Sequence, residues 1–382
     1  MKTILIIGGN FINKGAESML MATVDGIREH FPGYDPVLVD LFPVKTDVEK
    51  KNYDYRIVNM HVRTLFRISF PFLKMFFTRK TISDDENSIK RLFREADALF
   101  DISGYGLSAH NQPLLWSVAY LLPFHLARKS RVPVWLLPQS FGPFNFRGIK
   151  KLLFRWWGQD LLNYPTLAFA REPESMEALE SVRKSPVLLS SDIVLHREPK
   201  AGNQAGREVI VIPNRQLFNF SEPEKVVGLF AELIHCFLEK SMVVRIVRHS
   251  RDDEELCRRI SALVSHNLLI IDNSDYSVEA LVEIISSAEM VVSARYHGAV
   301  HALICHKPLL IIGWAGKYRH LVQLFDLKNH LMDLQHQEIE DMDVNRFVAG
   351  LIAEKEILSE KITDRLEQIR RDSFWNQIVL KS

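Results

Sequence analysis

The sequence has few of the features by which several large classes of protein are recognised. Its three cysteines, Cys236, Cys257 and Cys305, include no Cys-x-x-Cys pair, which argues against a disulfide framework and a cysteine-based metal site. No run of about 18 or more uncharged apolar residues occurs, so a membrane-spanning helix is not expected. The net charge is only +1, with 25% charged residues, so no overall field favours nucleic acid or an acidic polymer. Any partner must therefore be recognised locally.

Familiar catalytic and nucleotide-binding motifs are also missing. There is no Gly-x-Ser-x-Gly elbow to expose a nucleophilic serine. The turn at 8–18 contains Gly8, Gly9 and Gly15, but their spacing fits neither the dinucleotide-binding pattern nor the P-loop pattern. Each cysteine lies in an apolar helical context, which favours packing over covalent catalysis. A strand begins within the first few residues, which leaves no room for a signal peptide and predicts a cytoplasmic protein.

The sequence does contain a regular alternation of strands and helices. Its 382 residues suffice for two domains, each with a buried core. The alternation runs through 1–195, is interrupted by a polar stretch with Pro and Gly at 196–208, and resumes over 209–345. A charged helical segment, 346–382, follows. This pattern, twice over, predicts an α/β protein with two Rossmann-like domains, each built on a parallel sheet, joined by a linker at 196–208.

One stretch, 290–327, predicts a binding site most directly. Two apolar runs of strand length, Met290–Val292 and Pro308–Ile312, flank a segment with helical periodicity. Arg295 and His297 then fall where the first strand ends and the helix begins, and ligands of open α/β sheets bind at the carboxyl ends of the strands. A guanidinium fork, a titratable imidazole and a helix N-terminus suit an anionic ligand that carries phosphate or carboxylate.

A second basic cluster follows the second of these strands. Lys317, Arg319 and His320 come shortly after its end at Gly313, so they belong to the same edge of the predicted sheet. Plain solvated loop charges are the alternative interpretation of Lys317 and Arg319.

The helix of this stretch contains two histidines that could belong to a metal site. His297 and His301 lie four residues apart, a spacing that zinc can use. The glutamate of a His-Glu-x-x-His motif is absent and no third ligand is evident, so we predict no metal. His301 fits a core histidine better, and His297, beside Arg295, fits a ligand-binding role better.

These residues resemble the signature of the polysaccharide pyruvyl transferase family. The resemblance is carried by Ser293-x-Arg295-Tyr296-His297 before a helix, by Lys307-Pro308 at the entry to a strand, and by Lys317 in the loop that follows. In the first half, further elements resemble the family: Asn10 with Gly15-Ala16-Glu17, the run Pro138–Phe144, Arg171-Glu172 with Ser175, and Ser191-Asp192. Many members have a run of three glycines at the position of Gly104-Tyr105-Gly106, so Tyr105 departs from the family pattern.

The resemblance implies a fold and an activity. Members are similar to glycosyltransferases of the GT-B architecture, in which two Rossmann-like domains face a central cleft, the first on the acceptor side and the second on the donor side. The segment 346–382 would pack back across the domain boundary. The implied reaction moves an enolpyruvyl unit from phosphoenolpyruvate, a co-substrate, onto a sugar of a surface polysaccharide such as an exopolysaccharide or capsule, or of its lipid-linked precursor, as a pyruvate ketal. No cofactor is implied.

The resemblance also implies roles for individual residues. Phosphoenolpyruvate needs several fixed cations and an acid, while the sugar needs a base and uncharged hydrogen-bonding groups. The expected donor-binding residues are Arg295, Arg171, His297 and Lys317. His297 is the expected acid, and Asp101 or Glu17 the expected base. The expected acceptor-binding residues are Asn10, Gln139 and Asp101.

A basic, aromatic segment, 62–79, stands apart from the alternation. It contains five phenylalanines and four cations but no acid, which suits the membrane interface. With a lipid-linked acceptor, it would bring the protein to the inner face of the membrane. A buried helical pair is the alternative.

Two other functions fit the same sequence. A glycosyltransferase would bind a nucleotide sugar and hold its ribose with a carboxylate, for which Asp272 and Asp275 are ambiguous candidates. A noncatalytic protein that binds sugar or phosphate is the second alternative.

Overall fold

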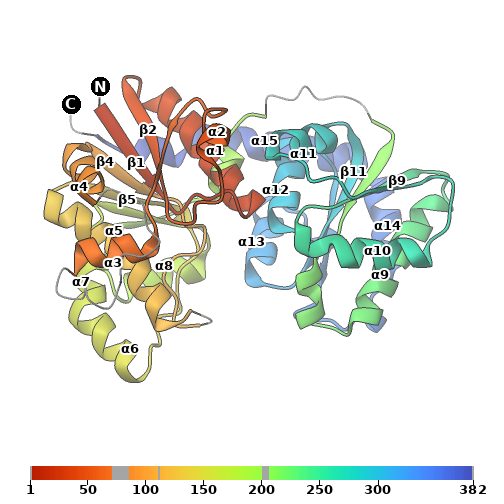
Figure 1. The fold of residues 1–382 in the computed structure, drawn as a ribbon. Helices are drawn as coiled ribbons and strands as arrows, with labels where there is room; N and C mark the ends of the chain where they lie inside the picture. Colours follow the sequence, from red (N-terminus) through yellow and green to blue (C-terminus); the bar gives the residue numbers. More distant parts are fainter. Residues whose placement is uncertain (1, 71–85, 111, 200–205, 381–382) are drawn as a thin grey trace. The chain divides into compact units, whose positions relative to one another are not determined.

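The computed structural model describes residues 2–70, 86–110, 112–199 and 206–380 (Figure 1). The chain forms two compact units: one comprises 1–193 together with 372–382, and the other comprises 194–371. Among the described residues, no helix is both long enough and apolar enough to cross a membrane.

The first unit is built on a seven-stranded parallel sheet with the order β3-β2-β1-β4-β5-β6-β7. Its strands are β1 (Lys2–Ile7), β2 (Tyr34–Asp40), β3 (Arg56–Asn59), β4 (Ala98–Asp101), β5 (Val134–Gln139), β6 (Leu167–Ala170) and β7 (Val187–Leu189). The central strands read as continuous apolar runs because helices cover both faces of the sheet.

Helices connect the strands of the first unit. They are α1 (Lys14–His30), α2 (Asp47–Lys50), α3 (Val62–Ser69), α4 (Glu86–Glu95), α5 (Leu114–Ser130), α6 (Gly148–Leu153), α7 (Gln159–Leu162) and α8 (Pro173–Glu180). Helices α3, α4 and α7 contact α5, whereas α1 contacts the short helix η8 (Phe374–Gln377). A π-helical turn, η2 (Phe154–Gly158), lies between α6 and α7.

The second unit repeats the design with a six-stranded parallel sheet, in the order β10-β9-β8-β11-β12-β13. Its strands are β8 (Glu208–Ile212), β9 (Val243–Val247), β10 (Leu269–Asp272), β11 (Ala288–Ser293), β12 (Leu309–Gly313) and β13 (Leu331–Asp333). The strand order reverses between β8 and β11. In open α/β sheets this reversal opens a crevice for ligands at the carboxyl ends of the strands.

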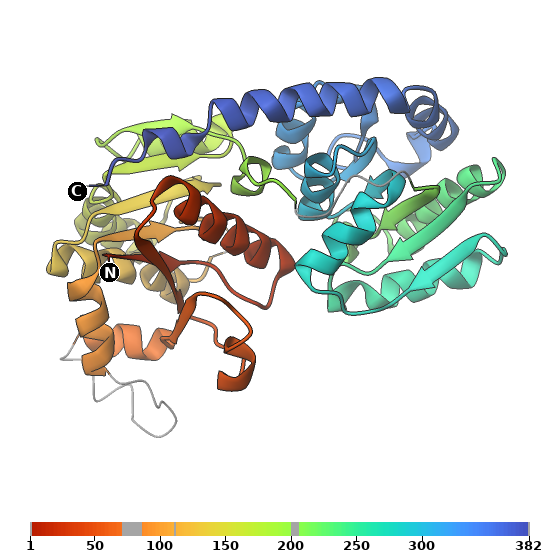
Figure 2. The ribbon, with the colours of Figure 1, turned by 90° about the horizontal axis from the view of Figure 1, so that it is seen from above.

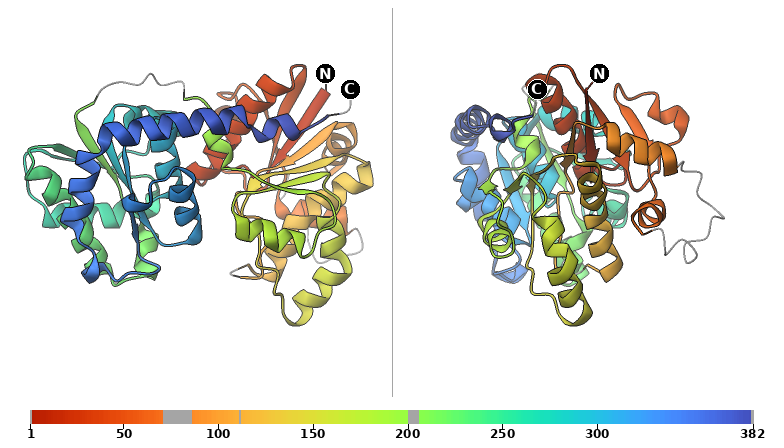
Figure 3. Two further views of the ribbon diagram at one scale, coloured as in Figure 1. Left: turned by 180° about the vertical axis from the view of Figure 1, so that it is seen from behind. Right: turned by 90° about the vertical axis from the view of Figure 1, so that its left-hand side faces the viewer.

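Helices also connect the strands of the second unit. They are α9 (Pro223–Leu238), α10 (Glu254–Leu263), α11 (Val278–Ser286), α12 (Tyr296–Ile304), α13 (Gly316–Leu324), α14 (Val344–Ala353) and α15 (Lys355–Arg371). Helix α9 contacts α10 and α14, and α12 contacts α11 and α15. Helix α15 is the long blue helix of Figure 2, and the left view of Figure 3 shows α14 leading into it.

The last described residues belong to the first unit. After α15 the chain passes at 371/372 into a segment whose short helix η8 packs against α1. The indole of Trp375 lies against Gly26 so closely that a β-carbon there would overlap the ring. Trp375 also contacts the rings of Phe31 and Phe100. The unit boundary at 193/194 lies just before the predicted linker, 196–208, part of which falls outside the described residues.

The segment 62–79 is described only as far as residue 70. Helix α3 buries Leu65, Phe66 and Ile68 in the apolar core of the first unit, and Arg67 pairs with Glu86. For residues 62–70 the structure therefore supports the alternative interpretation, a buried helix, because the apolar side chains that would enter a membrane point into the protein. Residues 71–79 of the predicted membrane segment lie outside the described residues.

Candidate functional site

The strand-to-helix junction predicted around Arg295 is present in the second unit. Strand β11 ends at Ser293, and Arg295 is the N-cap of α12. The Ser293 hydroxyl accepts a hydrogen bond from the Arg295 N–H at 3.2 Å and donates to the Arg295 carbonyl at 2.9 Å. A β-carbon on Gly298 would lie 2.5 Å from the Ser293 hydroxyl, so glycine lets α12 begin close to the strand. The junction is thus fixed by local contacts.

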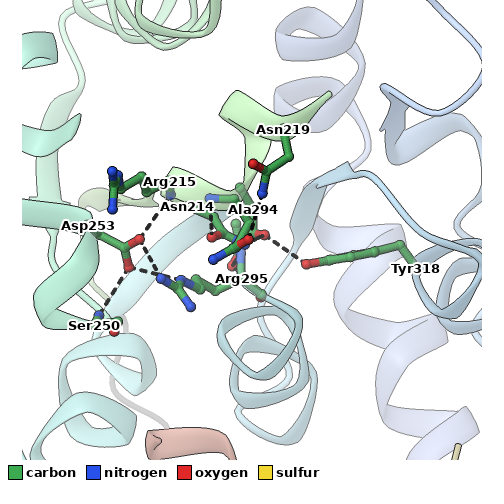
Figure 4. A network of polar contacts seen from close by, with 10 residues as sticks. Asn214, Arg215, Asn219, Ser250, Asp253, Ala294, Arg295 and Tyr318 are labelled. Atoms are coloured by element: carbon green, nitrogen blue, oxygen red, sulfur yellow. Dashed lines mark hydrogen bonds and ion pairs between the residues drawn. The ribbon is translucent and has the colours of Figure 1, made fainter. Parts of the chain in front are cut away.

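A buried aspartate holds the Arg295 side chain in place. Figure 4 shows the guanidinium pointing to Asp253, which accepts from its Nε at 2.9 Å and from its Nη2 at 2.5 Å. Asp253 is fully buried and also accepts from the backbone N–H groups of Arg215, at 3.0 Å, and Ser250, at 3.1 Å. Asp253 uses Nε and Nη2 of the fork, which leaves Nη1 for another acceptor. The ion pair thereby orients a charge-assisted donor.

Two further buried residues fix the backbone of the same junction. Asn214, which follows β8, donates through Nδ2 to the Ala294 carbonyl at 2.9 Å, and the Tyr318 hydroxyl donates to that carbonyl at 2.9 Å (Figure 4). Burial raises the pKa of Tyr318, so its hydroxyl stays a neutral donor. The ends of β8 and β11, where the strand order reverses, are thus joined by hydrogen bonds.

Lys317 lies among aromatic rings at the start of α13. Its ammonium lies 5.0 Å from the ring centroid of Tyr296, 5.3 Å from that of Trp314 and 5.6 Å from that of Tyr318. Aromatic faces attract a cation at such distances. The lysine expected to be a ligand-binding residue is therefore held beside the junction. Arg319, from the same basic cluster, forms an ion pair with Asp333 at 3.0 Å.

The two histidines of α12 have different surroundings. His297 is partly exposed, and its ring lies 5.3 Å from that of Tyr296 in an edge-to-face arrangement. His301 is fully buried, with its ring stacked 6.1 Å from that of His249. Within the described ranges, no group of three or more His, Cys, Asp and Glu side chains is placed to hold a metal ion.

In the first unit, Arg171 lies in a buried network of its own. It follows β6 and is 5% exposed. Its Nη1 donates to Asp192 at 2.7 Å and its Nη2 to the Ser140 hydroxyl at 2.7 Å. The Ser140 hydroxyl in turn donates to Glu172, whose carboxylate also accepts from Ser175 at 3.1 Å. Three of the four family-like elements of the first half thus meet each other, and they surround one cation with two carboxylates.

Asp101 and Gln139 form a second buried network in the first unit. Both are fully buried at the ends of β4 and β5. The Asp101 carboxylate accepts from Gln139 Nε2 at 2.9 Å, from the Tyr120 hydroxyl at 2.8 Å and from both the backbone and the hydroxyl of Ser103. Burial raises the pKa of Asp101, against the opposite effect of these hydrogen bonds. The buried Asp101 carboxylate therefore links the end of β4 to the end of β5 through Gln139.

The remaining predicted residues of the first unit lie around the start of α1. The Asn10 side chain accepts from the backbone of Ile12 at 3.1 Å and of Asn13 at 3.2 Å, which fixes the turn after β1. Glu17 is partly exposed in the first turn of α1. Gly8 has a φ of 86°, and a β-carbon there would overlap Ser103, so this turn requires glycine.

The structure therefore brings the second-unit residues together and separates the first-unit residues into two buried networks and a turn. Sequence reasoning missed Asp253, Asn214 and Tyr318. A signal for Asp253 exists, because Ser250-x-x-Asp253 is the pattern of a capping box, and the structure contains that box.

Comparison with known proteins identifies the family. The family model for polysaccharide pyruvyl transferase matches residues 13–316, which include the Arg295 junction and both networks of the first unit. The chain belongs to the polysaccharide pyruvyl transferase family. The match supports the predicted assignment of the chain to the transferases. Asn10 and Lys317 lie outside the matched range. A search of curated proteins gives no match.

Solved structures with similar folds confirm the predicted fold class. S. aureus MnaA, in a co-structure with UDP, is 12% identical over 100% of this chain and 99% of its own, with a TM-score of 0.57. A putative UDP-N-acetylglucosamine 2-epimerase from Listeria monocytogenes is 10% identical over 99% and 98%, with a TM-score of 0.57. Anabaena Alr3699/HepE, in complex with UDP and glucose, is 13% identical over 97% and 99%, with a TM-score of 0.52. The fold is that of two parallel-sheet α/β domains of the GT-B class.

Proposed function

We propose that this family member transfers the enolpyruvyl unit of phosphoenolpyruvate to a sugar of a surface polysaccharide or its lipid-linked precursor. The product is a pyruvate ketal, and phosphate is released. One observation supports the donor side most strongly: the Tyr296 ring lies 5.3 Å from the His297 ring and 5.0 Å from the Lys317 ammonium, directly after the clamped Arg295. His297 and Lys317 thus both lie against the residue that follows Arg295, at the crevice of the second sheet.

This cluster suits the shape of the donor. Phosphoenolpyruvate carries a phosphate and a carboxylate on one enol carbon, so it needs cations from more than one direction. Arg295 offers Nη1 in an orientation that Asp253 sets, and Lys317 offers a point charge held against aromatic faces. Arg171 has no place in this proposal, because it is buried and its fork is used by Asp192 and Ser140.

The chemistry requires two additions at the same carbon. The first sugar hydroxyl adds at C2 of the enol while C3 gains a proton, so the loss of the hydroxyl proton balances the gain at C3. Phosphate then leaves, the second hydroxyl bonds to C2, and its proton leaves with the phosphate. We assign the donor-side proton transfers to His297, because an imidazole titrates near neutral pH.

We assign the acceptor sugar to the first unit. Glu17, partly exposed at the start of α1, is the better candidate for the base, and Asp101 is a positioning residue that holds Gln139. Asn10 and Gln139 remain the proposed partners of sugar hydroxyls. An acceptor carried on lipid would bring the protein to the inner face of the membrane.

The test compares phosphoenolpyruvate with UDP. A ligand that binds only the folded state raises the melting temperature, so phosphoenolpyruvate should protect the protein and UDP should not. Added sugar acceptor should then release phosphate. Protection by UDP alone would favour a nucleotide-sugar glycosyltransferase. Protection by phosphoenolpyruvate without turnover on any acceptor would favour a noncatalytic binding protein.

A further inference from the structure

The surface formed by α6 and the π-helical turn η2 is divided into a packed side and an exposed side. On the packed side, Phe154 and Trp157 line a shallow apolar hollow together with Leu114 and Leu121 of α5. Lys150 donates to the Gln112 carbonyl at 2.6 Å, which ties α6 to the start of α5. The segment is therefore fixed on the first unit, at its lower end in Figure 1.

The exposed side carries three large apolar side chains. Ile149 is 66% exposed, Leu152 is 68% exposed and Trp156 is 79% exposed. Their spacing of three and four residues places them along one stripe of the helical segment. Leu115 and Trp116, at the start of α5, are also exposed. So large an apolar stripe in water indicates a partner.

Cations flank the stripe, and acids are absent from it. Arg147, Lys151 and Arg155 are all exposed. The sequence contains no Asp or Glu from 132 to 159, and Asp160, the first acid after it, forms an ion pair with Arg128. We call the six exposed residues the α6 face: Arg147, Ile149, Lys151, Leu152, Arg155 and Trp156.

We propose that the α6 face is a docking surface for an anionic lipid bilayer. Trp and aliphatic side chains enter the boundary between headgroups and acyl chains, while Lys and Arg bind the headgroups. Charge decides between this partner and a second copy of the chain. A symmetric dimer through this face would bring like charges together without an acid to oppose them. An anionic bilayer can accommodate both features, because its headgroups bind the cations and its acyl region takes up the apolar side chains.

The experiment measures sedimentation with vesicles in the absence of phosphoenolpyruvate and sugar, so its outcome does not depend on the proposed reaction. The protein should bind vesicles that contain phosphatidylglycerol and bind phosphatidylcholine vesicles much less. A variant with Arg147→Gln, Lys151→Gln and Arg155→Gln should partition about 100-fold less, since each cation near an anionic surface contributes about fivefold. A variant with Ile149→Ser, Leu152→Ser and Trp156→Ser should lose binding.

The control removes the same charge elsewhere. Lys184, Lys240 and Lys328 are exposed residues outside the α6 face, and their replacement by Gln should leave vesicle binding within about twofold. All variants should keep the melting temperature of the parent, because every altered side chain is exposed. Equal loss in the control, or unchanged binding in both α6-face variants, would overturn the proposal. So would a parent protein that dimerises without lipid, if the serine variant is monomeric and still binds vesicles.

Discussion

Each unit places an arginine just after a strand of its parallel sheet and pairs it with a buried aspartate, but the two arginines have different surroundings. In the first unit, the guanidinium of Arg171 donates to Asp192 and Ser140, with Glu172 3.9 Å away. In the second, Asp253 takes two nitrogens of Arg295, whose side chain remains 19% exposed. The first arginine holds the fold together, and the second is oriented with donor capacity to spare.

Two arginines at similar positions on a sheet edge can therefore differ in the charge that surrounds them. Arg171 sits among two carboxylates, so its surroundings carry net negative charge and repel an anion. Arg295 pairs with one carboxylate, that of Asp253, among the described residues, so its charge is less fully compensated than that of Arg171. The number of carboxylates around each guanidinium therefore predicts that Arg295 is better placed than Arg171 to bind an anion.

The largest expected effect tests whether the chemistry belongs to the second unit. His297→Gln should lower turnover about 100- to 10,000-fold with little change in phosphoenolpyruvate affinity, because an acid acts mainly in the transition state. Phosphate release measures turnover. His336→Gln, at an exposed position of the same unit, is the control and should be near normal. Near-normal turnover in His297→Gln would remove this residue from the mechanism.

The second expected effect is on the stability of the two ion pairs. Arg171→Met should lower the free energy of unfolding by about 3–5 kcal/mol, because it leaves Asp192 buried without its cation. Arg295→Met should cost less, since Asp253 keeps two backbone donors. Urea unfolding measures both. Adding Asp192→Asn to Arg171→Met should restore part of the loss, and a double variant no better than the single one would count against the ion pair.

A smaller effect concerns donor affinity. Arg295→Ala should weaken phosphoenolpyruvate binding roughly 10- to 100-fold, since a hydrogen bond to a charged group contributes about 1.5–3 kcal/mol. Arg295→Lys should recover the charge but not the planar fork. Arg171→Lys is the matched control and should leave affinity unchanged. Calorimetry with phosphoenolpyruvate reads all three, and equal losses at both sites would erase the distinction between the arginines.

The smallest expected effect is on the pH dependence of stability, to which one histidine of each unit contributes. Burial lowers the pKa of His125, in the first unit, from 6.5 to about 4, and lowers that of His306, in the second, by less. The unfolded chain therefore takes up protons that the native state does not. Stability should be full above about pH 6.5 and fall as the pH drops toward 4. His125→Phe should flatten this acid limb more than His306→Phe; the reverse order would contradict the assignment.

The sequence predicts the second site better than the first because the second is local. The apolar runs around Arg295 give the strand, helix and strand close to their observed bounds, and Tyr296, His297 and Lys317 follow within one supersecondary unit. Asp253 lies 42 residues from Arg295, and periodicity does not reveal which side chains meet over such a separation.

The first unit shows the same limit more strongly. Arg171 and Asp192 were each recognisable as family-like, yet their contact spans 21 residues and two strands of the sheet. The prediction that Arg171 binds the donor takes no account of Asp192, because the sequence does not reveal this internal partner. Similarly, Asp101 is well placed by sequence at the end of β4, but only packing reveals that its carboxylate is fully buried.

The return of the chain to the first unit at 372 has a consequence for biosynthesis. The indole of Trp375 covers Gly26 of α1 and contacts Phe31 and Phe100, so this part of the first core is finished by residues that the ribosome adds after the whole second unit. At about 5–20 residues per second, the nascent first unit waits roughly ten seconds or longer with an uncovered aromatic surface. The second unit can fold during that interval. The first unit is thus synthesised first, but its core is completed last.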